Sequence, residues 1–91
     1  MGLDMLELIM GIEEEFQIDI DDEKTAELLT VGDLYNLIVS ELDNAHRLGR
    51  GKSWTKEEAW EAMCRVIVAQ IGVKRAEINS EARIVADLGV D

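Results

Sequence analysis

The chain has 91 residues, of which 47% are apolar and 32% are charged, and its formal net charge is −11. This size and composition fit one globular domain over residues 1–91 and exclude a second independent core. The acidic excess disfavours binding to nucleic acid and favours partners with basic surfaces. A single cysteine, Cys64, excludes an intramolecular disulfide and a cysteine-rich zinc site, which favours a reducing compartment, the cytoplasm.

No segment is expected to span a membrane. Glu7 interrupts the first apolar run and Gln70 interrupts the second, so neither run approaches the roughly 20 residues that a bilayer requires. The first residues also lack the basic start of a signal peptide.

Three helices are predicted in the first half of the chain. Apolar residues recur at helical spacing over residues 3–16, with acidic residues on the other face. Residues 17–21 alternate like a strand but have no partner strand, so they are interpreted as an extended connection to a short helix over 22–29. Thr30 can cap a third helix over 31–42 in a capping box with Asp33. Its predicted buried face consists of Val31, Leu34, Leu37, Ile38 and Leu42.

The second half is predicted to contain a linker, one helix and a long loop. Residues 43–54 contain glycines and basic residues without periodicity, which is typical of a linker. Thr55 is expected to cap a helix that ends at Gly72. Residues 73–91 show no sustained period, so they are interpreted as an ordered loop held to the core by Val73, Ile78, Ile84, Val85 and Leu88.

Two short motifs imitate functional sites and fail in their spacing. The run 51–53 (GKS) imitates the end of a phosphate-binding loop, but His46 stands where the first glycine is required. The acidic residues of 19–23 imitate a calcium loop, but the turn glycine and the final glutamate are replaced by Lys24 and Thr30. A flexible linker and a solvated acidic surface are the favoured interpretations, and no metal site is predicted.

Catalytic groups are also missing. His46 and Cys64 have no third partner for a nucleophilic arrangement. Trp54 and Trp60 are expected to cover the edge of the core. The sequence therefore predicts that the chain is not an enzyme.

Residues 3–16 (LDMLELIMGIEEEF) closely resemble the second helix of acyl carrier proteins, and the similarity continues through 18–20 (IDI), the short helix and 30–33 (TVGD). Residues 66–74 (VIVAQIGVK) and 78–91 resemble the first helix of that family and the loop after it. In the family these segments precede the second helix, whereas here they come last. The sequence therefore resembles a circularly permuted acyl carrier protein, which implies an all-α bundle of three long helices and one short helix.

A permutation of this kind is physically plausible, because the ends of compact domains often lie close together. The family's first and last helices are antiparallel, and the linker 43–54 can extend to about 40 Å. Joining Asp91 to Gly2 would regenerate the family's continuous run, except that the family has serine where Gly2 stands. Opening the chain there removes the serine cap of the helix that follows, at an expected cost of about 1–2 kcal/mol.

In the family, that serine carries 4′-phosphopantetheine, whose thiol holds acyl groups as thioesters. The resemblance places the attachment point at Gly2, between Asp91 and Leu3, where no nucleophile is present. It implies that usual charging is lost and that no cofactor is expected on this chain. The serines that are present, Ser40, Ser53 and Ser80, do not occupy the family position.

The resemblance also implies a docking face and an acyl cleft. Residues 1–43 hold 13 acidic residues and only one cation, Lys24. In the family, the acidic face of the second helix binds basic surfaces of acyl synthases and of the phosphopantetheinyl transferase; the corresponding residues here are Asp4, Glu7, Glu13 and Glu14. The candidate residues for lining the acyl cleft are Leu6, Met10, Leu28 and Leu29, with ordinary core packing favoured for Leu6 and Leu28.

The favoured interpretation is thus an acyl-carrier-like scaffold of fatty acid or polyketide biosynthesis that cannot be charged at the usual site. One alternative is a functional carrier that lacks the serine only because of where the chain ends. Another is an interaction module or decoy that occupies basic docking sites on acyl-handling enzymes. A third is a domain-swapped dimer in place of a monomer, since the segments on either side of the linker could pair between two chains.

Overall fold

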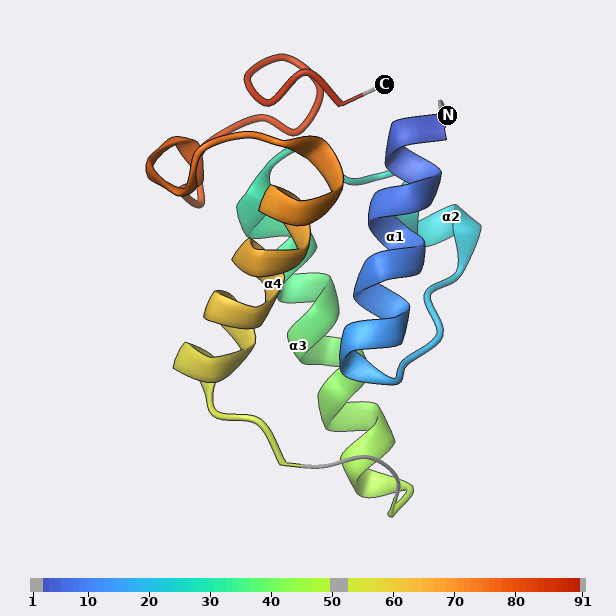
Figure 1. Cartoon of the computed structure of the whole chain (residues 1–91). Coiled ribbons are helices and arrows are strands. Elements are labelled where there is room, and N and C mark those ends of the chain that lie inside the picture. The colour runs from blue at the N-terminus through green and yellow to red at the C-terminus, as the bar shows by residue number, and fades with distance from the viewer. Residues whose placement is uncertain (1–2, 50–52, 91) are drawn as a thin grey trace.

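The computed structural model describes residues 3–49 and 53–90 (Figure 1). These residues form the helices α1 (Leu3–Phe16), α2 (Asp22–Thr25), α3 (Val31–Arg47) and α4 (Lys56–Ile71) and the short 3-10 helix η1 (Arg75–Glu77). Within the described ranges the only extended pairing is an isolated antiparallel bridge between Thr30 and Arg83. The predicted all-α bundle of three long helices and one short helix is confirmed.

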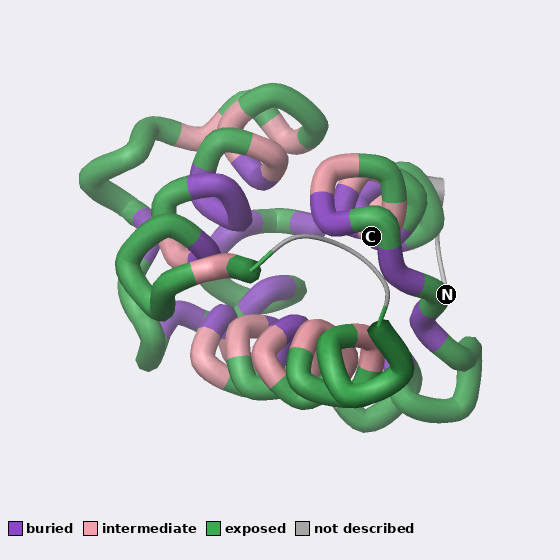
Figure 2. Tube along the Cα trace, turned by 90° about the horizontal axis from the view of Figure 1, so that it is seen from below, coloured by how far each residue is buried: buried purple, intermediate pink, exposed green. Residues whose placement is uncertain are grey.

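The core lies where α1, α3 and α4 face one another. Figure 2 shows the buried residues gathered toward the inside of the bundle. Leu8 and Ile12 of α1 and Met63 and Ile67 of α4 are fully buried, and α1 and α4 form the most extensive helix pair. A Cβ atom added to Gly11 would lie 3.0 Å from Val66 Cγ1. The absence of a side chain at Gly11 therefore lets the two helices approach closely.

The ends of α3 and α4 confirm the predicted caps. Thr30 Oγ1 accepts a hydrogen bond from Asp33 N at 3.1 Å, and Asp33 Oδ2 accepts one from Thr30 N at 3.0 Å. Thr55 and Glu58 form the same capping box at the start of α4. Gly72 ends α4 with φ +83°, a left-handed conformation that glycine adopts without a steric penalty.

The short helix α2 ends at Thr25, four residues before the predicted end at 29. The backbone of Leu29 has other hydrogen-bond partners, because Leu29 N donates to Asp33 Oδ2 at 3.1 Å and Leu29 O accepts from Ile84 N at 2.9 Å. In a helix over 22–29, Leu29 N would donate to Thr25 O, so it would lose its bond to Asp33. Lys24 Nζ lies 2.7 Å from Glu41 Oε1 and ties α2 to α3.

The predicted linker is wrong over residues 43–47, because α3 continues to Arg47. Leu42 packs against the core, and the helix ends where Leu48 N still bonds to Asn44 O and Gly49 takes φ +74°. The helical hydrogen bonds therefore persist until a glycine allows the chain to turn. His46 lies exposed in the last turn of α3 rather than in a linker.

The terminal loop is ordered, as predicted, and it covers the start of α3. Val31 N donates to Ala82 O and Gly32 N donates to Ser80 O, both at 2.9 Å. Ile78, Ile84, Leu88 and Val90 are buried, but Val85 is 60% exposed, so its predicted contact with the core is wrong. The local turn explains this: Arg83 N donates to Asp87 Oδ2 at 2.7 Å and Leu88 N donates to Arg83 O, which directs Val85 away from the core that Ile84 enters. The described end of this loop and the first turn of α1 lie at the same end of the bundle (Figure 1).

Substituting Gly32 by alanine tests the contact between α3 and the loop. The new Cβ would lie 2.9 Å from Ser80 O, so the loop must move. We expect Gly32→Ala to lower the free energy of unfolding by about 1–3 kcal/mol, although alanine favours helix formation over glycine by about 1 kcal/mol. Urea unfolding followed by circular dichroism measures this. Asn36→Ala, an exposed change in the same helix, should leave stability unchanged or slightly raised, and equal stability of both variants would contradict the close approach.

Asp33 makes stability depend on pH. Its pKa lies below the usual value of 3.8 because the carboxylate accepts hydrogen bonds from Thr30 N and Leu29 N. A group with a lowered pKa stabilises the fold fully above its unfolded pKa, and this contribution is lost as the pH falls through its folded pKa. We therefore expect Asp33→Asn to destabilise the protein at neutral pH, with a deficit relative to wild type that shrinks below pH 3.8. Asp43→Asn, an exposed change in α3, controls for the general loss of a negative charge; a deficit that stayed constant with pH would refute the role of Asp33.

Candidate functional site

The described residues do not assemble catalytic or metal-binding machinery. No group of three or more His, Cys, Asp or Glu side chains among them could hold a metal ion. Cys64 is fully buried in α4, and this burial raises the pKa of its thiol, so it remains protonated and acts as a packing residue. None of the described helices is long and apolar enough to cross a bilayer.

The predicted attachment point lies at the start of α1. Gly2 and Asp91 are outside the described residues, as is the side chain of Leu3, with which α1 begins. Of the described residues at the end of the terminal loop, Leu88 and Val90 are buried. Glycine has no hydroxyl, so the residue at position 2 does not fit the group that a carrier serine holds.

The four predicted docking carboxylates lie along α1 in unequal environments. Glu7 and Glu14 are exposed, whereas Asp4 and Glu13 are half-buried. Glu13 Oε2 accepts a hydrogen bond from Ile20 N at 2.9 Å, which fixes the connection after α1 onto the helix. Glu13 therefore has a structural role that the sequence pattern did not indicate.

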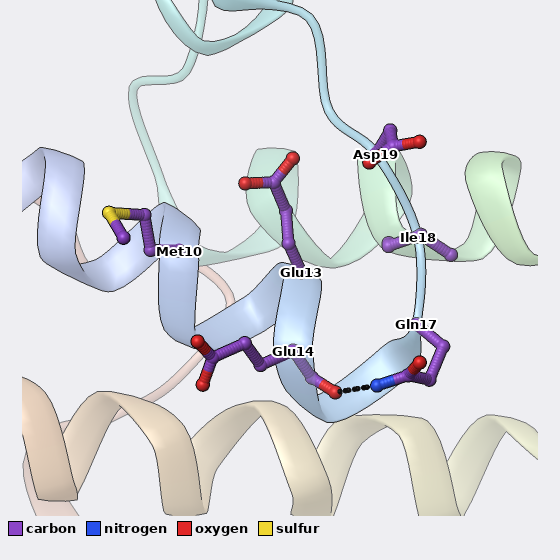
Figure 3. A pocket seen from close by; sticks show the side chains of 6 residues that line it. All are labelled: Met10, Glu13, Glu14, Gln17, Ile18 and Asp19. Carbon is purple, nitrogen blue, oxygen red and sulfur yellow. Dashed lines mark hydrogen bonds between the residues drawn. The ribbon is translucent and has the colours of Figure 1, made fainter.

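An open hollow lies between the last turns of α1 and the connection that follows (Figure 3). It has a volume of about 450 Å³ and is lined by Met10, Glu13, Glu14, Gln17, Ile18 and Asp19. Gln17 adopts a left-handed conformation with φ 57°, and its Nε2 donates to Glu14 O at 2.7 Å. Three carboxylates and one thioether thus surround this hollow, an arrangement that suits a cationic group with an apolar stem.

Three of the four candidate residues of the acyl cleft lie on the surface. Leu6 is 43% exposed, Met10 is 50% exposed and Leu29 is 61% exposed. Leu28 is half-buried against the core, in line with its expected packing role, whereas the expected core packing of Leu6 is wrong. Leu6 and Met10 are one helical turn apart on α1, away from the face that contacts α4. They form an exposed apolar pair beside the exposed carboxylates of Glu7 and Glu14.

Two surface features were missed at the level of sequence. Leu29 and Val85 are exposed on segments joined by the hydrogen bond from Ile84 N to Leu29 O. Tyr35 and Trp60 form an edge-to-face pair between α3 and α4, with ring centroids 5.4 Å apart. Helical spacing does not reveal such a pair, because it depends on how α3 and α4 cross. The predicted packing of Trp54 and Trp60 at the edge of the core is confirmed.

Comparison with known proteins identifies partial relatives. No protein-family model and no solved structure matches the chain. Acyl carrier protein 3, mitochondrial, of Arabidopsis thaliana is 54% identical over 40 residues, which are 44% of this chain and 30% of the relative. The acyl carrier proteins of Clostridium acetobutylicum and Phaeodactylum tricornutum are 50% and 42% identical over 37 residues, which are 41% of this chain and 48% and 49% of those relatives.

The resemblance to acyl carrier proteins is thus confirmed over a stretch of 37 to 40 residues. The chain spans less than half the length of each of these relatives. All three are named as carriers, which agrees with the prediction that this chain is not an enzyme.

Removing the carboxyl group of Glu13 tests its structural role. Glu13→Ala should lower the free energy of unfolding by about 1–2 kcal/mol, because Ile20 N loses a charged acceptor. Glu14→Ala is the matched control: it removes a neighbouring charge in the same helical turn, and we expect a change within about 0.5 kcal/mol. Both values are measured by urea unfolding. Equal effects of the two substitutions would contradict a special role of Glu13.

Proposed function

We propose that this chain is an acyl-carrier-like scaffold with circularly permuted connectivity, which binds acyl-handling enzymes through α1 and is not charged at the usual position. The observation that carries the proposal is the similarity to acyl carrier proteins over 37 to 40 residues within an all-α bundle. The relatives are named as acyl carriers, and we propose that the partners of this chain handle acyl thioesters in a pathway of fatty acid or polyketide type.

Permutation is supported by the course of the described part of the terminal loop. The terminal loop bonds to the start of α3 through Ala82 O and Ser80 O and returns toward the first turn of α1. The last helix, α4, packs mainly against α1. A chain that entered α1 directly from this loop could keep the same packing. Residues 66–91 resemble the segments that precede the second helix in carriers, so such a chain would have the order of elements found in carriers.

Loss of charging is supported by the side-chain chemistry at position 2. Attachment of a phosphopantetheine arm needs a hydroxyl nucleophile, and Gly2 has none. The exposed serines lie elsewhere along the chain: Ser40 in α3, Ser53 just before α4 and Ser80 in the terminal loop. None of them precedes α1, so we propose that this chain carries no cofactor.

Docking to basic partners is supported by the surface of α1. Glu7 and Glu14 are exposed on the same helix as the apolar side chains of Leu6 and Met10. Such a face matches a basic surface with an apolar centre, because the carboxylates steer the approach while the apolar side chains lose contact with water on binding. We propose acyl synthases and a phosphopantetheinyl transferase as the partners of this face, in the cytoplasm.

The interaction-module alternative shares this docking face. A chain that docks without carrying an acyl group would compete with a normal carrier for the same enzymes. The exposed pair of Leu6 and Met10 beside two carboxylates supports docking independently of charging. Whether acyl-handling enzymes still bind the chain therefore distinguishes an interaction module from a scaffold that has lost its function.

The test is to restore the serine. We expect Gly2→Ser, incubated with coenzyme A and a broad-specificity phosphopantetheinyl transferase, to gain the mass of the arm in intact-protein mass spectrometry. The unaltered chain and Gly2→Ala should gain nothing, because neither has a hydroxyl at this position. In Gly2→Ser, the further change Glu7→Gln should slow the modification if the acidic face of α1 is recognised.

Two outcomes would contradict the proposal. Modification of the unaltered chain would show that the attachment point does not lie at position 2. If Gly2→Ser stays unmodified while circular dichroism shows an intact fold, the transferase does not recognise α1 and the proposed docking face is also wrong.

A further inference from the structure

We propose that the surface where α3 meets the first turns of α4 binds an arginine side chain of a partner protein, with the guanidinium against the ring of Trp60 and paired with the Glu57 carboxylate. This site lies outside the α1 face on which the proposed carrier function depends. It does not require the carrier function to be correct.

The surface is hollowed and mostly aromatic at its base. A depression of about 540 Å³ is lined by Tyr35, Lys56, Glu57, Trp60 and Glu61. Tyr35 and Trp60 are half-buried and pack against the core. Aromatic faces in this state are exposed enough to be contacted and buried enough to be held in place.

The two rings are held by contacts within the protein. Their centroids are 5.4 Å apart with an interplanar angle of 76°. The Tyr35 hydroxyl also donates to Lys56 O at 3.1 Å, which links the second turn of α3 to the first turn of α4. A ligand would therefore meet a preorganised aromatic surface and would not have to order it on binding.

The rim carries carboxylates, and one of them already binds a guanidinium. Arg75 Nη2 lies 3.0 Å from Glu61 Oε1. Glu57 is exposed, and among the ion pairs formed by the described residues none involves it. Glu61 thus already makes the carboxylate–guanidinium pair that we propose for the ligand, and Glu57 offers a second carboxylate for such a pair.

Arginine fits this combination better than other ligands. Its planar guanidinium stacks on aromatic rings and pairs with carboxylates at the same time. Residues 44–91 hold seven acidic and eight basic residues, so the attraction for a cation comes from the exposed Glu57 carboxylate itself and not from the net charge of the chain. An acyl chain would fit poorly, because the depression is open and its rim is charged. Lys56 also lies on the rim and should compete with an incoming cation.

The test is a titration followed by nuclear magnetic resonance of the two tryptophan indoles. The probe is a glycine–serine peptide with one central arginine, and its control is the same peptide with neutral citrulline in that place. We expect a saturable shift of the Trp60 indole with the arginine peptide only. The Trp54 indole, which packs against Phe16 with centroids 4.7 Å apart and does not line the depression, should not move.

Substitutions make the test specific to the rim. Glu57→Gln should weaken binding about three- to fivefold, as expected for loss of one ion pair at a partly exposed site. Lys56→Gln should tighten binding by a similar factor, because the competing ammonium is removed. Glu7→Gln, which removes an equal charge from α1, should leave the affinity unchanged. Trp60→Leu removes the indole probe, so its binding is followed through the backbone amide of Glu57, and its affinity for the arginine peptide should fall because the guanidinium loses the ring beneath it.

Three results would overturn the proposal: no saturable Trp60 shift, equal binding of the citrulline peptide, or equal weakening by Glu7→Gln and Glu57→Gln. The last would show that the peptide responds to net charge alone. If Trp60→Leu fails to fold, the opposite effects of Glu57→Gln and Lys56→Gln, both at exposed positions, still decide the question. Transferase modification of Gly2→Ser does not enter this readout, so failure here is distinguishable from failure of the carrier proposal.

Discussion

The attachment of the terminal loop to the start of α3 is the constraint on which the rest of the structure depends. Val31 N, Gly32 N and Leu29 O all bond to backbone atoms of residues 80–84. These bonds satisfy free backbone groups at a helix start, where a side-chain cap alone satisfies only part of them. They also hold the terminal loop against the start of α3.

The charge of the molecule is divided between surfaces with different roles. On α1, Glu7 and Glu14 are exposed beside Leu6 and Met10, whereas Glu13 holds the backbone of Ile20. Glu13 and Glu14 are adjacent in one acidic run, but of the two carboxylates only that of Glu13 accepts a hydrogen bond from the described connection after α1. Their equal charge does not reveal this difference. On α3 and α4, carboxylates flank an aromatic pair. The surface of α1 therefore has exposed carboxylates beside aliphatic side chains, whereas the surface on α3 and α4 has both acidic and basic side chains beside aromatic rings.

Much of the fold was predictable because its signals are local. The span of α1, the capping box of Thr30 and Asp33, the cap at Thr55 and the end of α4 at Gly72 agree with the structure. The extents of α2 and α3 were not predictable in the same way. The predicted end of α2 is not reached because Leu29 N bonds to Asp33, and α3 is lengthened where a glycine-containing, basic segment suggested a linker. In both cases contacts or turns beyond the segment itself overrode its composition.

The sequence by itself determined an all-α chain with defined helix starts, an acidic first half and a stretch resembling acyl carrier proteins, with no hydroxyl at position 2. These properties depend on residue type and on spacing within a few turns, so periodicity and caps reveal them. Only the tertiary structure decided that Leu6 and Met10 are exposed, that Glu13 binds the connection after α1, and that Tyr35 meets Trp60. Those features depend on which helix faces pack together and at what crossing, because burial and long-range contacts arise between elements and not within them.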